Sequence, residues 1–326
     1  MENAIFFIGD DPYILWDVDI KKCNLDFLKN FDTRYYDYLL ELHLTSNDER
    51  RAAMSLRLTY HHALETLFSF LGALLQSPNF PNAWITQNRR VLNGVVRRIS
   101  EQDQTLPTIL YNKSISWESL AEVVFDRFSP GTDKQKKAIE GFSELWGMLA
   151  AEFLDKNRID ENNCIKHGFR VSSGGCALSV GVQKEKGVPC STDQMTVLEN
   201  SEFGTGFDRI QRISDEKNNR SLSITHFVLN WRVEKMTSLI RLISLSIQNI
   251  VGSLRIIGGE SPVEVQFNVL TDPEDYTRPW VYRPVIPYVS TKFGCHDSIP
   301  KLSREDLLTC LRDSGFPGFS EYAPES

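Results

Sequence analysis

One long helical pattern, from Ser46 to Gln76, constrains the fold more than any other part of the sequence. It contains no proline, and Gly72 is its single glycine. Ser46 and Glu49 have the spacing of a capping box. Apolar residues step by three and four along two adjoining stripes, made of Ala53, Leu56, Tyr60, Ala63, Leu67, Phe70 and Leu74 and of Leu64, Phe68, Leu71 and Leu75. A helix of about 30 residues is roughly 45 Å long. Its second half is apolar around most of its circumference, so we predict that it is the central rod of a helical bundle.

Further helical patterns lie on both sides of this rod. They cover residues 25–31, 32–44, 82–100, 117–128, 134–155 and 160–168. Strong periodicity returns at 233–257, where apolar residues again occupy one face. This last segment is nearly as long as the rod, so we expect it to pack back onto the bundle.

Residues 171–230 have a different character, with Gly, Ser and Pro between short β-type runs. The expected strands are 176–182, 195–198, 207–213 and 222–229. The tail after residue 258 holds a strand-like run at 263–270, a proline-rich stretch (Pro279, Pro284 and Pro287) and a short helix at 303–311. We therefore predict a single, mainly α domain. It comprises a long-helix bundle (1–170 and 231–258), a small antiparallel β insertion (171–230) and an irregular C-terminal extension (259–326).

Composition excludes several classes of protein. The 326 residues are 41% hydrophobic and 24% charged, which is typical of a globular protein. A net charge of −7 argues against broad binding to duplex nucleic acid, although a local basic groove remains compatible with it. The chain carries no phosphate-binding loop or dinucleotide fingerprint, so we expect no cofactor.

The cysteines and the apolar runs indicate the compartment. Six scattered cysteines without CxxC spacing favour reduced thiols and give no zinc pattern, so we expect no metal. The N-terminal segment lacks the basic start of a signal peptide, and the longest apolar run, near residues 64–75, is too short to cross a bilayer. The expected location is the cytoplasm, with no membrane partner.

A polar group interrupts the middle of the central rod. Arg57, His61 and Glu65 follow one another at one-turn spacing, and His62 also neighbours Glu65. They could form a metal or acid–base site inside the bundle. Di-metal bundles, however, use Glu-x-x-His on two helices with two further Glu, which this chain lacks. We favour a hydrogen-bonded structural role.

The segment from Asn162 to Arg170 places an amide, an imidazole and two cations at the end of a helix. Over residues 47–170, a helical bundle with Asn162, four intervening residues and His167 resembles the HEPN family of bacterial defence and toxin proteins. Members of that family dimerise around an RNA-cleaving groove that carries an Arg-x(4–6)-His motif. Asn162 stands here in place of the motif arginine, Asn163 in place of its polar neighbour and His167 in place of its histidine.

The resemblance implies an RNA-related or defence-related module, with RNA or another protein as partner and a homodimer as one assembly. Without the motif arginine, we expect a module without robust catalysis of its own. The enzyme alternative is a metal-independent ribonuclease that uses His167 with Lys166, Arg170 and Asn163. A third hypothesis is a protein-interaction scaffold. The plain structural interpretation is a helix end closed by Gly168, where Lys166 and His167 complement the helix dipole.

A basic stripe runs along the pattern at residues 82–100. It consists of Arg89, Arg90, Arg97 and Arg98, with Asn93 between the two pairs. Such a stripe could follow a phosphate backbone. In an acidic chain, a solvated helix face is the alternative that we favour.

Overall fold

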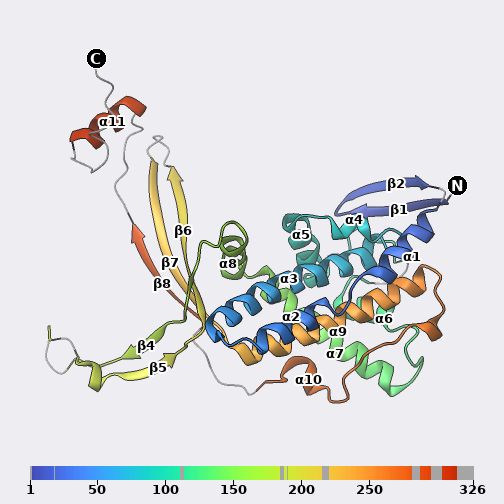
Figure 1. Ribbon diagram of the computed structural model, residues 1–326. Coiled ribbons are helices and arrows are strands. Elements are labelled where there is room, and N and C mark those ends of the chain that lie inside the picture. Colours follow the sequence, from blue (N-terminus) through green and yellow to red (C-terminus); the bar gives the residue numbers. More distant parts are fainter. Residues whose placement is uncertain are drawn as a thin grey trace.

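The structure is a computed structural model that describes residues 2–17, 19–110, 114–183, 187–188, 190–214, 220–280, 287–294 and 303–313. The fold is mainly α-helical with small antiparallel sheets, as predicted. Helices α3 (Glu49–Gln76) and α9 (Val233–Ile257) pack along one another in the helical body (Figure 1). Both match the predicted helices almost to the residue.

The remaining helices surround this pair or extend from it. They are α1 (Ile20–Asn30), α2 (Tyr35–Leu44), α4 (Asn82–Ile85), α5 (Arg89–Ser100), α6 (Trp117–Val124), α7 (Asp133–Leu154), α8 (Lys156–Lys166), α10 (Glu274–Thr277) and α11 (Arg304–Asp313). On α3, the predicted core positions Leu67, Phe70 and Leu74 are fully buried. The apolar stripe of α3 therefore forms part of the protein core, as its spacing predicts.

Two predicted helices differ from the structure, one in its N-cap and the other in being divided. The α3 N-cap is Asp48, whose carboxylate accepts from the Arg51 N–H, and not Ser46. The segment at 82–100, predicted as one helix, is divided into α4 and α5. Asn88 causes the break because its side chain accepts from the N–H groups of Arg90 and Val91 and so starts a new helix.

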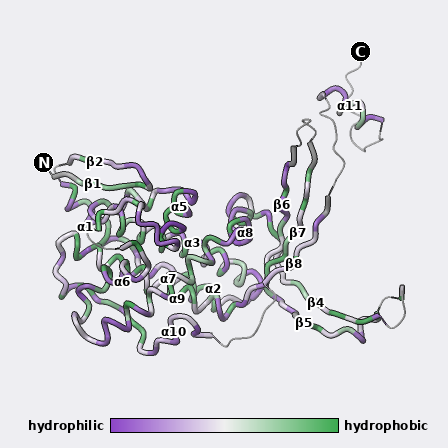
Figure 2. The backbone as a smooth tube through the Cα atoms, turned by 180° about the vertical axis from the view of Figure 1, so that it is seen from behind, coloured by the Kyte–Doolittle hydropathy of each residue, from purple (hydrophilic) through white to green (hydrophobic). Residues whose placement is uncertain are grey.

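The strands of the described residues form three antiparallel groups. A hairpin of β1 (Glu2–Ile8) and β2 (Asp11–Asp17) lies at one end of the helical body. Two arms leave the other end, as Figure 2 also shows from behind. One arm pairs β4 (Ala177–Val180) with β5 (Thr196–Asn200), and the other is a sheet in the order β3–β6–β7–β8. Its strands are β3 (Ser172–Ser173), β6 (Gly204–Ser214), β7 (Arg220–Asn230) and β8 (Tyr288–Gly294).

The C-terminal extension differs from the predicted irregular segment. Strand β8 pairs with β7, and Tyr276 of α10 packs its ring against Phe142 of α7. The run at 263–270 is not a strand. Its Asn268 N–H and C=O bind the Asn249 side chain of α9, which takes the place of a strand partner.

Some sequence-based expectations concern residues that the structure does not describe. Cys295 and Pro284 lie outside the described ranges. The other cysteines, Cys23, Cys164, Cys176, Cys190 and Cys310, are free thiols. Within the described part of the chain, α9 is the one helix long and apolar enough for a membrane span, and 67% of its apolar window is buried inside the protein. That burial is typical of the core helix of a soluble protein.

The single glycine of α3 has a packing role. Gly72 faces the ring of the fully buried Trp84, whose indole N–H donates to the Phe7 carbonyl at 3.1 Å. A Cβ at position 72 would lie 2.5 Å from Trp84 Cε3. Glycine weakens a helix, but here it lets the indole approach the α3 backbone.

We expect Gly72→Ala to lower the free energy of unfolding by about 1–3 kcal/mol, because overpacking outweighs the gain in helix propensity. Gly94→Ala on α5 is the matched control, since nothing lies within 4 Å of a Cβ there. It should raise stability by about 0.5–1 kcal/mol. Urea denaturation of both variants measures the two effects, and a stabilised Gly72→Ala protein would contradict this account of the Trp84 contact.

Candidate nucleic-acid interface

Helix α8 is held to the central helix α3 by a buried charge cluster. Its carboxylate comes from Glu161, whose side chain is 0% exposed. Arg57 Nε donates to both Glu161 carboxylate oxygens at 3.1 Å, and His61 Nε2 lies 3.1 Å from Glu161 Oε2. The guanidinium also lies 5.4 Å from the centre of the Tyr60 ring. The polar group of the central rod thus binds a helix that follows about a hundred residues later.

The protonation states in this cluster follow from burial and charge. Burial opposes ionisation of Glu161, yet Arg57 and the His61 hydrogen bond hold the pKa of this carboxyl well below its usual range. Burial, with the nearby Arg57 charge, lowers the pKa of His61 to about 4. At neutral pH the imidazole is therefore neutral, and its Nε2–H donates to Glu161. The cluster is a charge-balanced Arg57–Glu161 pair supported by a neutral histidine.

A second carboxylate, Glu65, joins α3 to both α5 and α8. It accepts from Arg89 Nη1 at 3.2 Å, from Asn162 Nδ2 at 2.9 Å and from Lys166 Nζ. Burial would raise the pKa of Glu65, but Lys166 and Arg89 lower it below its ordinary value. Arg89 is further fixed by a bond to the Phe153 carbonyl. Glu65 therefore ties the start of α5 and the last turns of α8 to the middle of α3.

A third carboxylate, Glu152 of α7, accepts from Tyr60, from Arg158 at 2.5 Å and from Lys235 at 2.9 Å. Burial opposes its ionisation, but Arg158 and Lys235 lower the pKa of Glu152 to about 2. Neither Glu152 nor Glu161 was singled out in the sequence. The available signal for Glu161 is its one-turn spacing from Ile165, which places the carboxylate on the inward face of α8.

The sequence-predicted residues divide between these clusters and the surface. The structure brings Arg57 and His61 together and joins Glu65 to Lys166, whereas the His62 side chain is exposed and its backbone carbonyl accepts from the Tyr36 hydroxyl. His167 is the exposed C-cap of α8, followed by Gly168 at φ 101°. His61, Glu65 and His167 therefore do not meet at one point.

A groove lies between α5 and α8. Its volume is about 480 Å³, and its lining residues are Arg89, Arg90, Asn93, Gly94, Arg97, Ile159 and Asn163. No carboxylate is among them. Arg90 and Arg97 are exposed and form no ion pair with any described residue. Asn93 Oδ1 is buried and has no hydrogen-bond partner within the described part of the chain.

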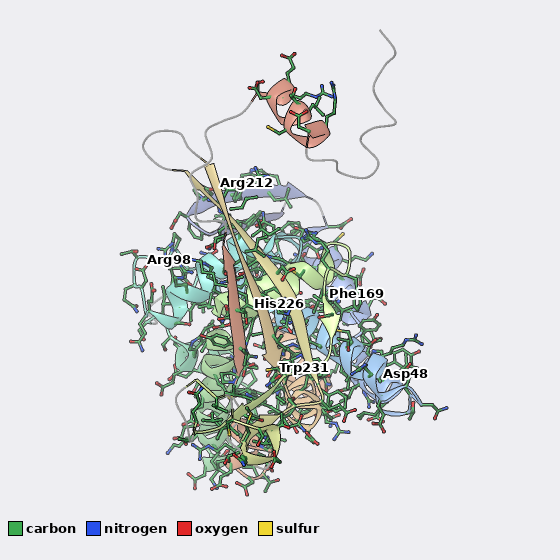
Figure 3. All side chains as sticks on the ribbon, turned by 90° about the vertical axis from the view of Figure 1, so that its left-hand side faces the viewer. Asp48, Arg98, Phe169, Arg212, His226 and Trp231 are labelled. Atoms are coloured by element: carbon green, nitrogen blue, oxygen red, sulfur yellow. The ribbon has the colours of Figure 1, made fainter. Side chains whose placement is uncertain are left out.

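Arg98, the fourth arginine of the stripe, does not belong to the groove. It donates to Asp10 and to Asp103, each at 2.6 Å, on a different side of α5. Figure 3 labels it away from the long β ribbon. Its charge is neutralised locally, and it ties the β1–β2 turn to the end of α5.

The geometry of the groove suits an extended anion. Arg90 and Arg97 are separated by about 10 Å along the helix axis at 1.5 Å per residue. Each planar guanidinium can bind a phosphate through two parallel hydrogen bonds. The amides of Asn93 on α5 and Asn163 on α8 also line the groove and can donate or accept. The groove therefore presents two positive charges, spaced along the axis of α5.

Comparisons with known proteins supply no relatives. No protein-family model matches the chain, and no curated protein or solved structure shows significant similarity to it. Among the described residues, no three His, Cys, Asp or Glu side chains are grouped closely enough to hold a metal ion. The interpretation of the groove therefore rests on the geometry and charges given above.

The buried His61 gives a pH prediction. Its pKa is about 4 in the folded protein and 6.5 without perturbation, so the unfolded chain binds more protons between these values. Stability should fall by up to about 3 kcal/mol as the pH drops from 6.5 to 4. Denaturant titrations at several pH values measure this. In His61→Gln the slope should flatten, leaving contributions such as that of His43, whose pKa burial also lowers. An unchanged slope in this variant would contradict the assignment.

Proposed function

We propose that this chain is a HEPN-like helical module that binds single-stranded RNA along the groove between α5 and α8. On this proposal the helical body is a long-helix bundle that acts in a cytoplasmic, defence-related complex, alone or as a homodimer. The observation that carries the proposal is the composition of the groove: Arg90, Arg97 and two asparagines line it, together with Arg89, which Glu65 already binds from behind.

Several properties favour RNA over a small anion. A small anion needs cations that converge on one point, whereas Arg90 and Arg97 are displaced along the helix axis. Exposed bases of a single strand can bond to amides through their edges, and Asn93 and Asn163 supply amides in the groove. The net charge of −7 repels a polyanion from other surfaces and confines the contact to this groove.

The side chains around His167 favour binding without cleavage. Asn162, at the position of the motif arginine, is fully buried and donates to Glu65. Lys166 is held in an ion pair with the same carboxylate. Arg170 is the remaining nearby cation in the sequence, and it is exposed beyond the helix end. The ribonuclease alternative would have to rely on His167 and Arg170.

The groove is tested with fluorescence anisotropy on a labelled single-stranded RNA across a salt series. Removing one phosphate contact should lower the slope of log K against log salt by about 0.7. We therefore expect Arg90→Ala and Arg97→Ala each to reduce the slope by about this amount and to weaken binding for all sequences alike. Arg127→Ala removes an exposed arginine outside the groove and should leave binding unchanged.

A steric pair of variants tests the position independently of charge. Gly94 has open space in front of its Cα, so Gly94→Phe places a ring in the groove, while Gly94→Ala scarcely narrows it. We expect Gly94→Phe to lose RNA binding and Gly94→Ala to retain it, with both proteins folded by circular dichroism. Equal binding by the two variants would place the RNA elsewhere.

Two experimental results would favour an alternative function over RNA binding. Metal-independent RNA cleavage that disappears in His167→Ala would favour the ribonuclease. Absence of RNA binding by the wild type at low salt would favour the scaffold, for which the β1–β2 hairpin provides support. The outward face of that hairpin exposes Ile5, Ile14 and Trp16 by 52%, 53% and 58%, while Ala4 and Phe6 on its other face are buried.

A further inference from the structure

The two faces of the β6–β7 ribbon have different surroundings. Phe207 and Phe227, paired across the strands, are buried on the face toward α8, where Arg209 binds Asn157 at 2.9 Å. Because successive side chains alternate between faces, the neighbouring pair Asp208 and His226 lies on the opposite face. Figure 3 shows His226 partway along this ribbon, between Arg212 toward the tip and Trp231 at its base.

A serine hydroxyl, that of Ser172, lies beside this pair. Ser172 of β3 pairs with Gly206 of β6, so its side chain lies on the same face as Asp208, two residues further along β6. A Cβ on Gly206 would collide with Ser172 Oγ and would lie 3.7 Å from His226 Nε2. The serine hydroxyl and the imidazole therefore both approach the Cα of Gly206, and the serine fills space that a side chain at residue 206 would take.

We propose that Ser172, His226 and Asp208 form a nucleophilic triad that hydrolyses carboxylic esters on this outer face. His226 Nδ1 lies 2.7 Å from Asp208 Oδ1. That bond fixes the tautomer in which Nε2, the nitrogen near Ser172, is unprotonated and can accept a proton. In the structure, Ser172 Oγ donates to the Gly206 carbonyl at 3.4 Å, which is a weak hydrogen bond. On this proposal, rotation of the Ser172 side chain about its Cα–Cβ bond exchanges that bond for one to His226 Nε2.

The open edge of the sheet provides a backbone donor. Gly174 N–H donates to the Gly204 carbonyl at 3.0 Å, so these two residues form a hydrogen-bonded pair. Hydrogen-bonded and non-hydrogen-bonded pairs alternate along an antiparallel ladder, so the adjacent Ser173–Thr205 pair is not hydrogen-bonded. Ser173 N–H therefore points away from β6, and β3 is the edge strand. The N–H of the residue after a nucleophile is a common oxyanion donor.

The reaction balances without a cofactor. Ser172 Oγ forms a bond to the ester carbonyl carbon while its proton passes to His226 Nε2. The carbon–oxygen bond to the leaving alcohol breaks, and the imidazolium returns the proton to that oxygen. A water molecule, deprotonated by His226, then releases the acid and restores Ser172. Ser172 and His226 are the catalytic residues, and Asp208 is a positioning residue.

A fluorophosphonate probe tests the triad in the full-length protein, because serine attack on phosphorus expels fluoride and leaves a stable mass label. We expect labelling at Ser172, identified by peptide mass spectrometry. General-base assistance is worth about 100-fold or more, so His226→Gln should slow labelling by that factor, and Asp208→Asn should slow it substantially.

Ser173→Ala is the matched control. Its side chain lies on the opposite face of the same strand, and the substitution keeps the backbone N–H, so labelling should persist. Labelling of Ser172 that survives heat denaturation or is unaffected by His226→Gln would overturn the proposal, as would absence of label in the folded wild type. These residues lie outside the α5–α8 groove, so RNA-binding results neither support nor weaken this inference.

Discussion

The ion pair between Arg57 and Glu161 is the contact on which the position of α8 depends. Both side chains are buried, each charge is compensated by the other, and neutral His61 adds a hydrogen bond to Glu161. Removing one partner of such a pair typically costs about 3–5 kcal/mol, because the remaining charge stays buried and unpaired. Helix α8 contributes little apolar burial of its own, with Ile165 as its one buried apolar residue. Polar contacts therefore decide where α8 lies.

That placement determines both surfaces described here. On one side, α8 completes the groove with α5 through Ile159 and Asn163. On the other side, Asp160 forms an ion pair with Arg209 of β6, whose guanidinium lies 4.3 Å from the centre of the Phe227 ring. The same helix thus holds the base of the long β ribbon and so positions its outer face. A change at Glu161 would therefore affect both surfaces although Glu161 belongs to neither.

The sequence predicted the long helices because their patterns are strong and local. Apolar spacing in 49–76 and 233–257 leaves little alternative to a buried helix. The antiparallel strands of 171–230 also lie close to the predicted runs. Predictions that depended on distant contacts were less successful: strand β8 needs β7 as a partner, and the run at 263–270 is bound by the Asn249 side chain instead of a strand. Neither partner can be read from local propensity.

For the candidate site, the sequence identified most of the cations and one of the three carboxylates that bind them, Glu65. Arg57, His61, Glu65, Arg89, Arg90, Arg97 and Lys166 all belong to the clusters or to the groove that the structure describes. Glu161 and Glu152 were missed because an isolated glutamate in a helix is indistinguishable from a surface residue until its partner is known. His167 was emphasised for its residue type, and the structure shows it as an exposed helix cap.

The distribution of charge also explains how an acidic chain can present a basic groove. Glu65, Glu152 and Glu161 point inward, where they neutralise Arg57, Arg158, Lys166 and Lys235. Since these carboxylates are occupied, they do not compete for Arg90 and Arg97 at the groove surface. Exposed guanidiniums are fully solvated and cost little to leave unpaired, whereas the same charges inside would be costly. Net charge is therefore a poor guide to what this groove binds, because the potential at its surface depends on which side of α5 and α8 each charge occupies.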